Sequence, residues 1–261
     1  MIRRIREKLA QIEKEHDVRI LYACESGSRA WGMSSQDSDF DVRFIYARKP
    51  EWYLCVDPVG KPDVIDAGMD FTPEGILDCN GWDVRKVLQL LQKSNGALLE
   101  WLHSPIAYRQ EGTFADDVRS IIPQVISPTA LWHHYRGIRD SSLGRFKSRP
   151  TAKVWLYALR PQLAMLWIEN TGTAPPVEFR RLVSCTCPPE LQGAVHALLE
   201  AKKHQREADS GFIPDPSLER FLLMQVRRGN AAPAPSPPPK GVDLDALFRK
   251  AIAAEHSSAS A

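Results

Sequence analysis

The sequence has few cysteines, and their distribution excludes a disulfide-rich scaffold. There are 5 in 261 residues, an odd number scattered along the chain: Cys24, Cys55, Cys79, Cys185 and Cys187. Scattered thiols in an otherwise globular composition indicate free cysteines in a reducing compartment. Only the last two lie close together, and no second Cys/His pair with zinc-like spacing accompanies them, so a zinc site is disfavoured.

The sequence also lacks long apolar runs and a strong excess of either charge. No stretch approaches the roughly 20 apolar residues that span a bilayer, and residues 1–17 are charged and amphipathic, unlike a signal peptide. We therefore expect a cytoplasmic protein. The net charge is only +2, so a nucleic-acid surface would have to arise from local clustering of basic residues.

Residue periodicity predicts a mixed α+β part followed by a helical part. In the first part we expect helices over 2–16 and 81–95, strands over 18–26, 40–47 and 75–80, loops with short strands over 51–71, and a short helix and strand within 97–108. In the second part we expect helices over 128–147, 151–170, 189–207 and 216–228.

The end of the chain differs in composition from both parts. Residues 230–241 are too rich in Pro and Ala to pack, and an amphipathic helix is predicted beyond them. That helix could dock on a partner or on a second copy of the chain through Leu244, Leu247, Phe248 and Ile252. We thus expect a first domain over 1–111, a helical domain over 112–229, and a linker with a tail over 230–261.

Three carboxylates at alternate positions, Asp37, Asp39 and Asp41, precede and enter the strand predicted over 40–47. Alternate residues of an extended chain share one side, where like charges repel unless a cation lies among them. Asp37 fits a solvated turn, whereas Asp41 lies in an apolar run, where an unpaired charge is costly to bury. Carboxylates with the spacing of Asp39 and Asp41 suit the divalent ions of phosphoryl and nucleotidyl transfer.

A Gly-Ser turn precedes these carboxylates, and its backbone N–H groups and hydroxyl could hold a triphosphate. The order Gly27-Ser28, ten residues, then Asp39-Phe40-Asp41-Val42 resembles the signature of the DNA polymerase β nucleotidyltransferase superfamily. The longer pattern is similar to the RlaP/YcgL-type branch, predicted nucleotidyltransferases named for their association with RNA repair. The segments that carry this likeness are "GSRAWG…SDFDVRFIY", "DCNGWDVRKVLQLLQKSNGALLEWLHSPIAY" and "KVWLYALRPQLAMLWIENTGTAPPVEF".

The resemblance implies a polymerase-β-like nucleotidyltransferase palm, a short mixed sheet flanked by helices, followed by a helical domain. It implies an enzyme that uses two Mg²⁺ ions, or Mn²⁺, to join a nucleoside monophosphate from a nucleoside triphosphate to an acceptor hydroxyl, for which we expect an RNA end. Asp39 and Asp41 match its paired metal ligands, and Gly27 and Ser28 its triphosphate-binding turn. The superfamily usually adds a third carboxylate from a later strand; we choose Asp78, with Asp66, Asp70 and Asp83 as alternatives.

Several basic residues have two possible roles each. Arg29 and Arg43 could contact phosphates or pair with the aspartates in a structural role, and Lys86 could reach a triphosphate or lie exposed on the surface. The densest basic segment is either a phosphate-binding rim or a solvated helix end; it comprises Arg136, Arg139, Arg145, Lys147, Arg149 and Lys153. Adjacent helical residues point in different directions, so a joint metal or acid–base role for His133 and His134 is disfavoured.

Two rival functions remain open from the sequence. The chain could be a nucleotidyltransferase that acts on a small molecule or a protein, or a non-catalytic nucleotide-binding module such as an antitoxin-like partner. The feature that discriminates the second rival is an acidic residue within metal distance of Asp39 and Asp41.

Overall fold

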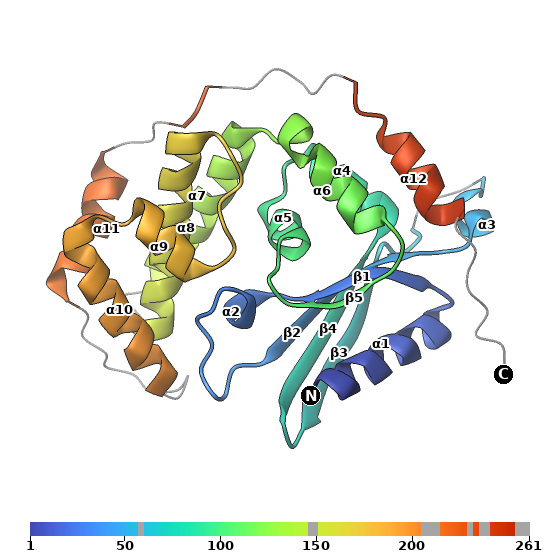
Figure 1. Ribbon diagram of the computed structural model, residues 1–261, viewed down its shortest axis with the longest axis horizontal. Coiled ribbons are helices and arrows are strands. Elements are labelled where there is room, and N and C mark those ends of the chain that lie inside the picture. Colours follow the sequence, from blue (N-terminus) through green and yellow to red (C-terminus); the bar gives the residue numbers. More distant parts are fainter. Residues whose placement is uncertain (57–59, 146–150, 205–214, 229–231, 235–240, 254–261) are drawn as a thin grey trace.

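A five-stranded sheet with helices on both faces forms one half of the molecule, and a group of helices forms the other (Figure 1). Figure 1 is a computed structural model that describes residues 1–56, 60–145, 151–204, 215–228, 232–234 and 241–253. The α+β class predicted from the sequence is confirmed. The predicted domain boundaries are untested by this architecture and stay a prediction.

The sheet has the strand order β3-β4-β2-β1-β5, in which β2 and β4 run parallel and the other neighbours run antiparallel. Its strands are β1 (Arg19–Glu25), β2 (Phe40–Ala47), β3 (Val64–Thr72), β4 (Gly75–Asp83) and β5 (Ala107–Gln110). The predicted strands over 18–26, 40–47 and 75–80 are confirmed. β3 is longer than the short strands expected there, and β4 continues beyond its predicted end.

Helix α1 (Ile2–His16) covers one face of the sheet and fixes which residues of β2 face the other way. Ile5, Leu9 and Ile12 of α1 form a core cluster with Val42 and Phe44, among others. Because successive strand residues point to opposite faces, the odd-numbered residues of β2 lie on the face away from α1. The sequence therefore places its carboxylates on the face that the helical part approaches.

The second face is covered by α4 (Val84–Gln92), α5 (Gly96–Leu102) and α6 (Phe114–Val125). The side chain of Asp83 caps α4 by accepting a hydrogen bond from the Arg85 N–H (2.8 Å). The helix predicted from residue 81 therefore begins later, because residues 81–83 belong to the strand that ends at this cap. Helix α6 was not predicted.

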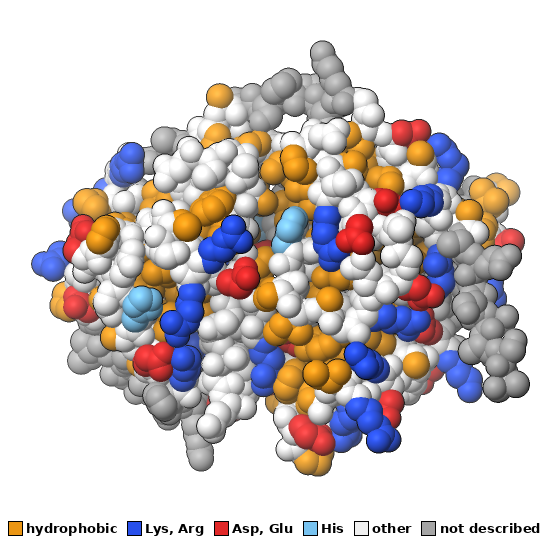
Figure 2. Space-filling model, in the orientation of Figure 1, with side chains coloured by type: hydrophobic (Ala, Val, Ile, Leu, Met, Phe, Trp, Pro, Cys, Tyr) orange, Lys and Arg blue, Asp and Glu red, His pale blue; other side chains and the backbone are white. Residues whose placement is uncertain are grey.

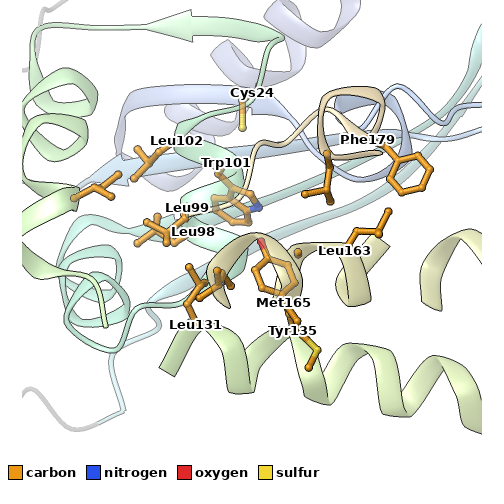
Figure 3. Packing of buried hydrophobic residues seen from close by; sticks show 14 of the residues in the cluster. Cys24, Leu98, Leu99, Trp101, Leu102, Leu131, Tyr135, Leu163, Met165 and Phe179 are labelled. Carbon is orange, nitrogen blue, oxygen red and sulfur yellow. The ribbon is translucent and has the colours of Figure 1, made fainter. Parts of the chain in front are cut away.

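The helical half comprises α7 (Pro128–Arg145), α8 (Ala152–Thr171), α9 (Phe179–Thr186), α10 (Pro189–His204) and α11 (Pro216–Arg227). A single large core joins it to the sheet, and Trp101 of α5 belongs to the same cluster as Tyr135, Leu163 and Phe179 of the helical half (Figure 3). Four of these helices were predicted, and α9 was not. No helix in the described part of the chain is long and apolar enough to cross a membrane.

Two helices of four residues, α2 (Gly27–Ala30) and α3 (Pro50–Tyr53), and the last helix, α12 (Leu244–Ala253), complete the fold. α12 packs on α4 and α6 (Figure 1). Arg19 donates to the carbonyl oxygen of Ala251 (2.6 Å), and the ring of Tyr53 meets that of Phe248 edge-on at 5.0 Å. The apolar face of the tail thus packs against its own chain.

Candidate active site

Two carboxylates on neighbouring parallel strands form the centre of the site. Asp41 of β2 and Asp78 of β4 are register partners, so their side chains emerge side by side from the same face. The guanidinium of Arg43 bridges them, with Nη2 donating to Asp41 Oδ1 (3.0 Å) and to Asp78 Oδ2 (2.7 Å). All three side chains are partly exposed, at 30%, 22% and 18% for Asp41, Asp78 and Arg43.

The charged form of the Asp41 carboxylate is stabilised by a nearby cation, Arg43. Burial raises the pKa of Asp41 above its usual value, Arg43 lowers it, and the charges of Asp78 and Asp39 raise it further. Asp39 is therefore close enough for its charge to reach Asp41. Asp41 and Asp78 are adjacent, and Asp39 adds negative charge near them, so positive charge is needed at this point.

The Gly-Ser turn lies directly against Asp41. Gly27 has a φ of 61°, a left-handed conformation that favours glycine, and a Cβ there would lie under 3.0 Å from Asp41 Oδ2. The N–H of Ser26 donates to the carbonyl oxygen of Asp41 (2.8 Å), and Ser28 is buried. The backbone of the turn is therefore in direct contact with Asp41, and its role in holding a triphosphate stays a prediction.

Arg29 holds the segment before β2. Its Nε donates to the carbonyl oxygen of Asp39 (2.9 Å) and its Nη2 to that of Ser38 (2.6 Å), while the guanidinium carbon lies 3.6 Å from the centre of the Phe40 ring. These contacts support the structural reading of Arg29, because they fix the backbone on which Asp39 sits.

A buried carboxylate, Glu25, supports Asp41 from β1. Glu25 Oε1 accepts a hydrogen bond from the Asp41 N–H (2.7 Å), and the hydroxyl of Tyr108 on β5 donates to Oε2. Burial raises the pKa of Glu25, although both hydrogen bonds lower it. We did not single out Glu25 from the sequence, where its one signal is an acidic residue at the end of an apolar strand.

Lys86 lies away from the aspartates. Its Nζ pairs with Asp63 (3.0 Å) beyond the end of β4. The five steps along the strand from Asp78 to Asp83 alone span about 16 Å at roughly 3.3 Å per residue. The predicted contact between Lys86 and a triphosphate finds no support in this placement.

The basic segment from Arg136 to Lys153 begins within α7 and ends in α8. Arg139 is buried and donates to Gln162 (2.8 Å), and Arg136 lies 3.9 Å from Asp140. Lys147 and Arg149 lie outside the described residues. The positive charge of Lys153 lowers the pKa of Asp41 slightly, so this residue contributes to the electrostatics of the site.

A cavity of about 250 Å³ opens between the carboxylates and the helical half. Gly27, Asp41 and Arg43 line it on the sheet side, and Tyr157 and Arg160 on the side of α8. A residue far from the sheet in sequence can thus contact a molecule bound at the aspartates. Sequence reasoning missed this wall because α7 and α8 follow the sheet by dozens of residues.

A buried ion pair organises the wall of this cavity. Glu100 Oε1 accepts hydrogen bonds from Arg160 Nη1 (2.8 Å) and the Tyr135 hydroxyl (2.9 Å), and Oε2 accepts from Trp31 Nε1 (2.9 Å). The Arg160 guanidinium also lies 4.2 Å from the Trp31 ring. One carboxylate thus ties three helices, α5, α7 and α8, to Trp31, the residue that follows α2.

The aspartates have the chemistry of a divalent-metal site, with a protein cation among them. Within the described ranges, no group of three or more His, Cys, Asp or Glu side chains is already placed to hold a metal ion. Asp41 and Asp78 nevertheless offer hard oxygen ligands from adjacent strands, and Arg43 shows that a positive charge fits between them. These residues fit Mg²⁺ provided that Arg43 moves aside.

Comparisons with known proteins point to one family. The model of the RNA repair pathway DNA polymerase beta family, RlaP, matches residues 1–250. The uncharacterized protein YcgL of Bacillus subtilis (strain 168) is 42% identical over 234 residues, which cover 87% of this chain and 86% of YcgL. A nucleotidyltransferase-like protein from Exiguobacterium sibiricum 255-15 aligns with 92% of this chain and 73% of its own at 11% identity and a TM-score of 0.33, a likeness too weak to argue from.

Proposed function

Because the chain belongs to the RNA repair pathway DNA polymerase beta family, we propose that it is a Mg²⁺-dependent nucleotidyltransferase. It transfers a nucleoside monophosphate from a nucleoside triphosphate to an acceptor hydroxyl at an RNA end. The observation that carries the proposal is the pairing of Asp41 with Asp78 across two parallel strands, beside the turn at Gly27.

Each residue has a role in this reaction. The acceptor oxygen forms a bond to the α-phosphorus while the bond from that phosphorus to the bridging oxygen breaks, and pyrophosphate leaves. Asp78 takes the proton of the acceptor hydroxyl, and the backbone at Gly27 and Ser28 holds the β- and γ-phosphates. Asp39, Asp41 and Asp78 would hold Mg²⁺, which neutralises the charge that develops on the phosphate oxygens.

Arg43 balances the site before substrate binds. It pairs with both Asp41 and Asp78 in the structure and offsets part of their charge. If Mg²⁺ were held by the aspartates, the side chain of Arg43 would be free to contact the phosphates. Arginine suits both positions, because its planar fork pairs equally well with carboxylate and phosphate.

The name of the family supports an RNA acceptor, and the surface of the chain is compatible with one. Figure 2 shows basic and acidic side chains interspersed over one face, without a continuous basic stripe. Such a face suits recognition of an RNA end better than binding along a long strand, which relies on many phosphate contacts.

The test is label transfer from α-³²P nucleoside triphosphates with Mg²⁺, Mn²⁺ or EDTA. RNAs with free 3′ ends, RNAs with blocked 3′ ends, a protein mixture and small hydroxyl compounds serve as acceptors. Metal-dependent label on the free 3′ ends supports the proposal. Label found only on protein or small molecules would show that the acceptor belongs to one of the rival classes.

A second candidate is a nucleotide-binding module without catalysis. The ion pairs of Arg43 with both carboxylates favour it, because a permanently bridged pair offers no metal site. This function predicts nucleotide binding that is indifferent to Mg²⁺ and is accompanied by no release of pyrophosphate with any acceptor.

A further inference from the structure

The far wall of the cavity is neutral and aromatic, unlike its opening at the aspartates. Tyr135, Tyr157 and Ile138 contribute to this wall, and the rings of Trp31 and Tyr157 meet edge-on at 5.3 Å. The carboxylate of Glu100 on this wall is neutralised by its ion pair with Arg160, whose atoms lie 2.8 Å apart. Aromatic and apolar surface of this kind attracts a ring system and repels a phosphate chain.

The volume of the cavity limits it to a small ligand. At about 250 Å³ it is smaller than the roughly 300 to 1,000 Å³ that take whole drug-sized molecules. One base with its sugar is compatible with this volume, whereas a nucleic-acid strand is not. Because Gly27 and Asp41 line its opening, a base held inside would leave its phosphates at the aspartates.

His134 is the polar side chain of this wall that is not used by the ion-pair network. Glu100 accepts from Trp31, Tyr135 and Arg160, whereas the structure records no hydrogen bond from the ring of His134 to any described residue. The ring packs against Gly96, where a Cβ would lie under 3.0 Å from it. Burial lowers the pKa of His134, which keeps the imidazole neutral, with one donor and one acceptor.

We propose that His134 determines the nucleotide preference of this site by hydrogen bonding to the edge of a base stacked in the cavity. This inference rests on the proposed function, because it requires a nucleoside triphosphate at the aspartates. A site that pairs a buried polar group with its ligand rejects ligands that leave the group unpaired. The four bases differ in the donors and acceptors on their edges, so one imidazole can separate them.

The test measures binding of the four non-hydrolysable Mg²⁺-nucleoside triphosphates and of Mg²⁺-tripolyphosphate by titration calorimetry. We expect the wild-type chain to bind its preferred nucleotide about tenfold or more tightly than the weakest. His134→Phe should reduce that ratio to about threefold or less. Because tripolyphosphate has no base, its affinity should not change.

Two further variants keep the test independent of folding. Gly96→Ala leaves the imidazole in the chain but displaces it, and should reduce the ratio in the same way. His133→Phe alters the exposed neighbour on α7 and should leave both affinities and ratio unchanged. The thermal unfolding midpoint of each variant is measured to check that the fold is retained.

Distinct outcomes overturn the inference and the proposed function. Equal binding of all four nucleotides by the wild-type chain, or an unchanged ratio in His134→Phe, would overturn the role of His134 alone. Equal loss of nucleotide and tripolyphosphate affinity in His134→Phe would also overturn it, by placing His134 at the phosphates. No binding of any nucleotide or of tripolyphosphate by the wild-type chain would refute the proposed function and the inference with it.

Discussion

Asp41 and Asp78 stand opposite each other on adjacent parallel strands, joined by one guanidinium that lies 3.0 Å from the first and 2.7 Å from the second. Two carboxylates held this close by the backbone repel each other unless a positive charge separates them. The fold therefore imposes a requirement for a cation at this point. In the structure Arg43 meets it, and in the proposed reaction Mg²⁺ does.

Loss of either carboxylate should abolish nucleotidyl transfer. We expect Asp41→Asn and Asp78→Asn each to reduce the rate by about 100-fold or more, because each removes a ligand of the Mg²⁺ that would neutralise the charge developing in the transition state. The measurement is pyrophosphate release with the acceptor identified by label transfer. The matched control is Asp66→Asn on the edge strand β3, which should retain full activity; an inactive Asp66→Asn with an active Asp78→Asn would reassign the third carboxylate.

A methyl group at Gly27 should disturb the site more than one at Gly32. Both glycines have positive φ, 61° and 71°, so alanine costs about 1 to 2 kcal/mol of backbone strain at either. Only at Gly27 would the new Cβ meet Asp41, since nothing lies within 4 Å at Gly32. We expect both variants to lose stability by urea unfolding, Gly27→Ala more because of its clash with Asp41, but loss of nucleotide binding in Gly27→Ala alone. Equal binding by the two variants would mean that the turn does not contact the triphosphate.

Glu25 should make the free energy of unfolding fall as pH rises. Burial raises the pKa of Glu25 in the folded state above its usual value, so the folded chain binds this proton more tightly than the unfolded chain. The stabilisation is complete below the unfolded pKa and is lost as pH rises through the raised folded pKa. Glu25→Gln removes this contribution while its amide can still bond to Asp41 and Tyr108.

The measurement for Glu25 is urea unfolding of both proteins from about pH 4 to pH 8. The difference between variant and wild type isolates Glu25 from other titrating groups, and we expect the variant to gain stability relative to wild type as pH rises. A difference that is constant with pH would show that the carboxylate titrates alike in both states.

Helix α12 should stabilise its own chain. Phe248 packs on Tyr53 and lies 5.5 Å from the guanidinium of Arg85, so we expect Phe248→Ala to cost about 2 kcal/mol, less than a fully buried phenylalanine. Arg249→Ala is the control, because this side chain is 66% exposed. If truncation before residue 242 left stability unchanged but altered the mass in solution, α12 would instead serve assembly.

Local pattern sufficed for the elements whose signals lie within a few residues. Ile5, Leu9 and Ile12 at helical spacing predicted α1, and their burial confirms it. Pattern was less precise at β3: loops with short strands were expected there, but Asp66, Gly68 and Asp70 lie on one longer edge strand that tolerates them. It failed at α6, a 12-residue helix that contains Pro123.

In the candidate site, too, the local features could be predicted from the sequence and the features that depend on tertiary packing could not. The spacing of Asp39 and Asp41 is local, and so is the turn at Gly27. The choice of Asp78 over its rivals followed from strand order and stays a prediction until its role is tested, although the register now places it beside Asp41. The position of Arg43 between the carboxylates and the wall around Glu100 depend on tertiary packing, which no short window of sequence encodes.

The most direct test of the account is titration calorimetry with a non-hydrolysable nucleoside triphosphate, with and without Mg²⁺, on the wild-type chain and on Asp41→Asn. If the aspartates hold the metal that carries the triphosphate, the wild-type chain binds the nucleotide only with Mg²⁺ and Asp41→Asn loses that binding. Equal affinity with and without Mg²⁺, or unchanged Mg²⁺-dependent binding in Asp41→Asn, would contradict the account.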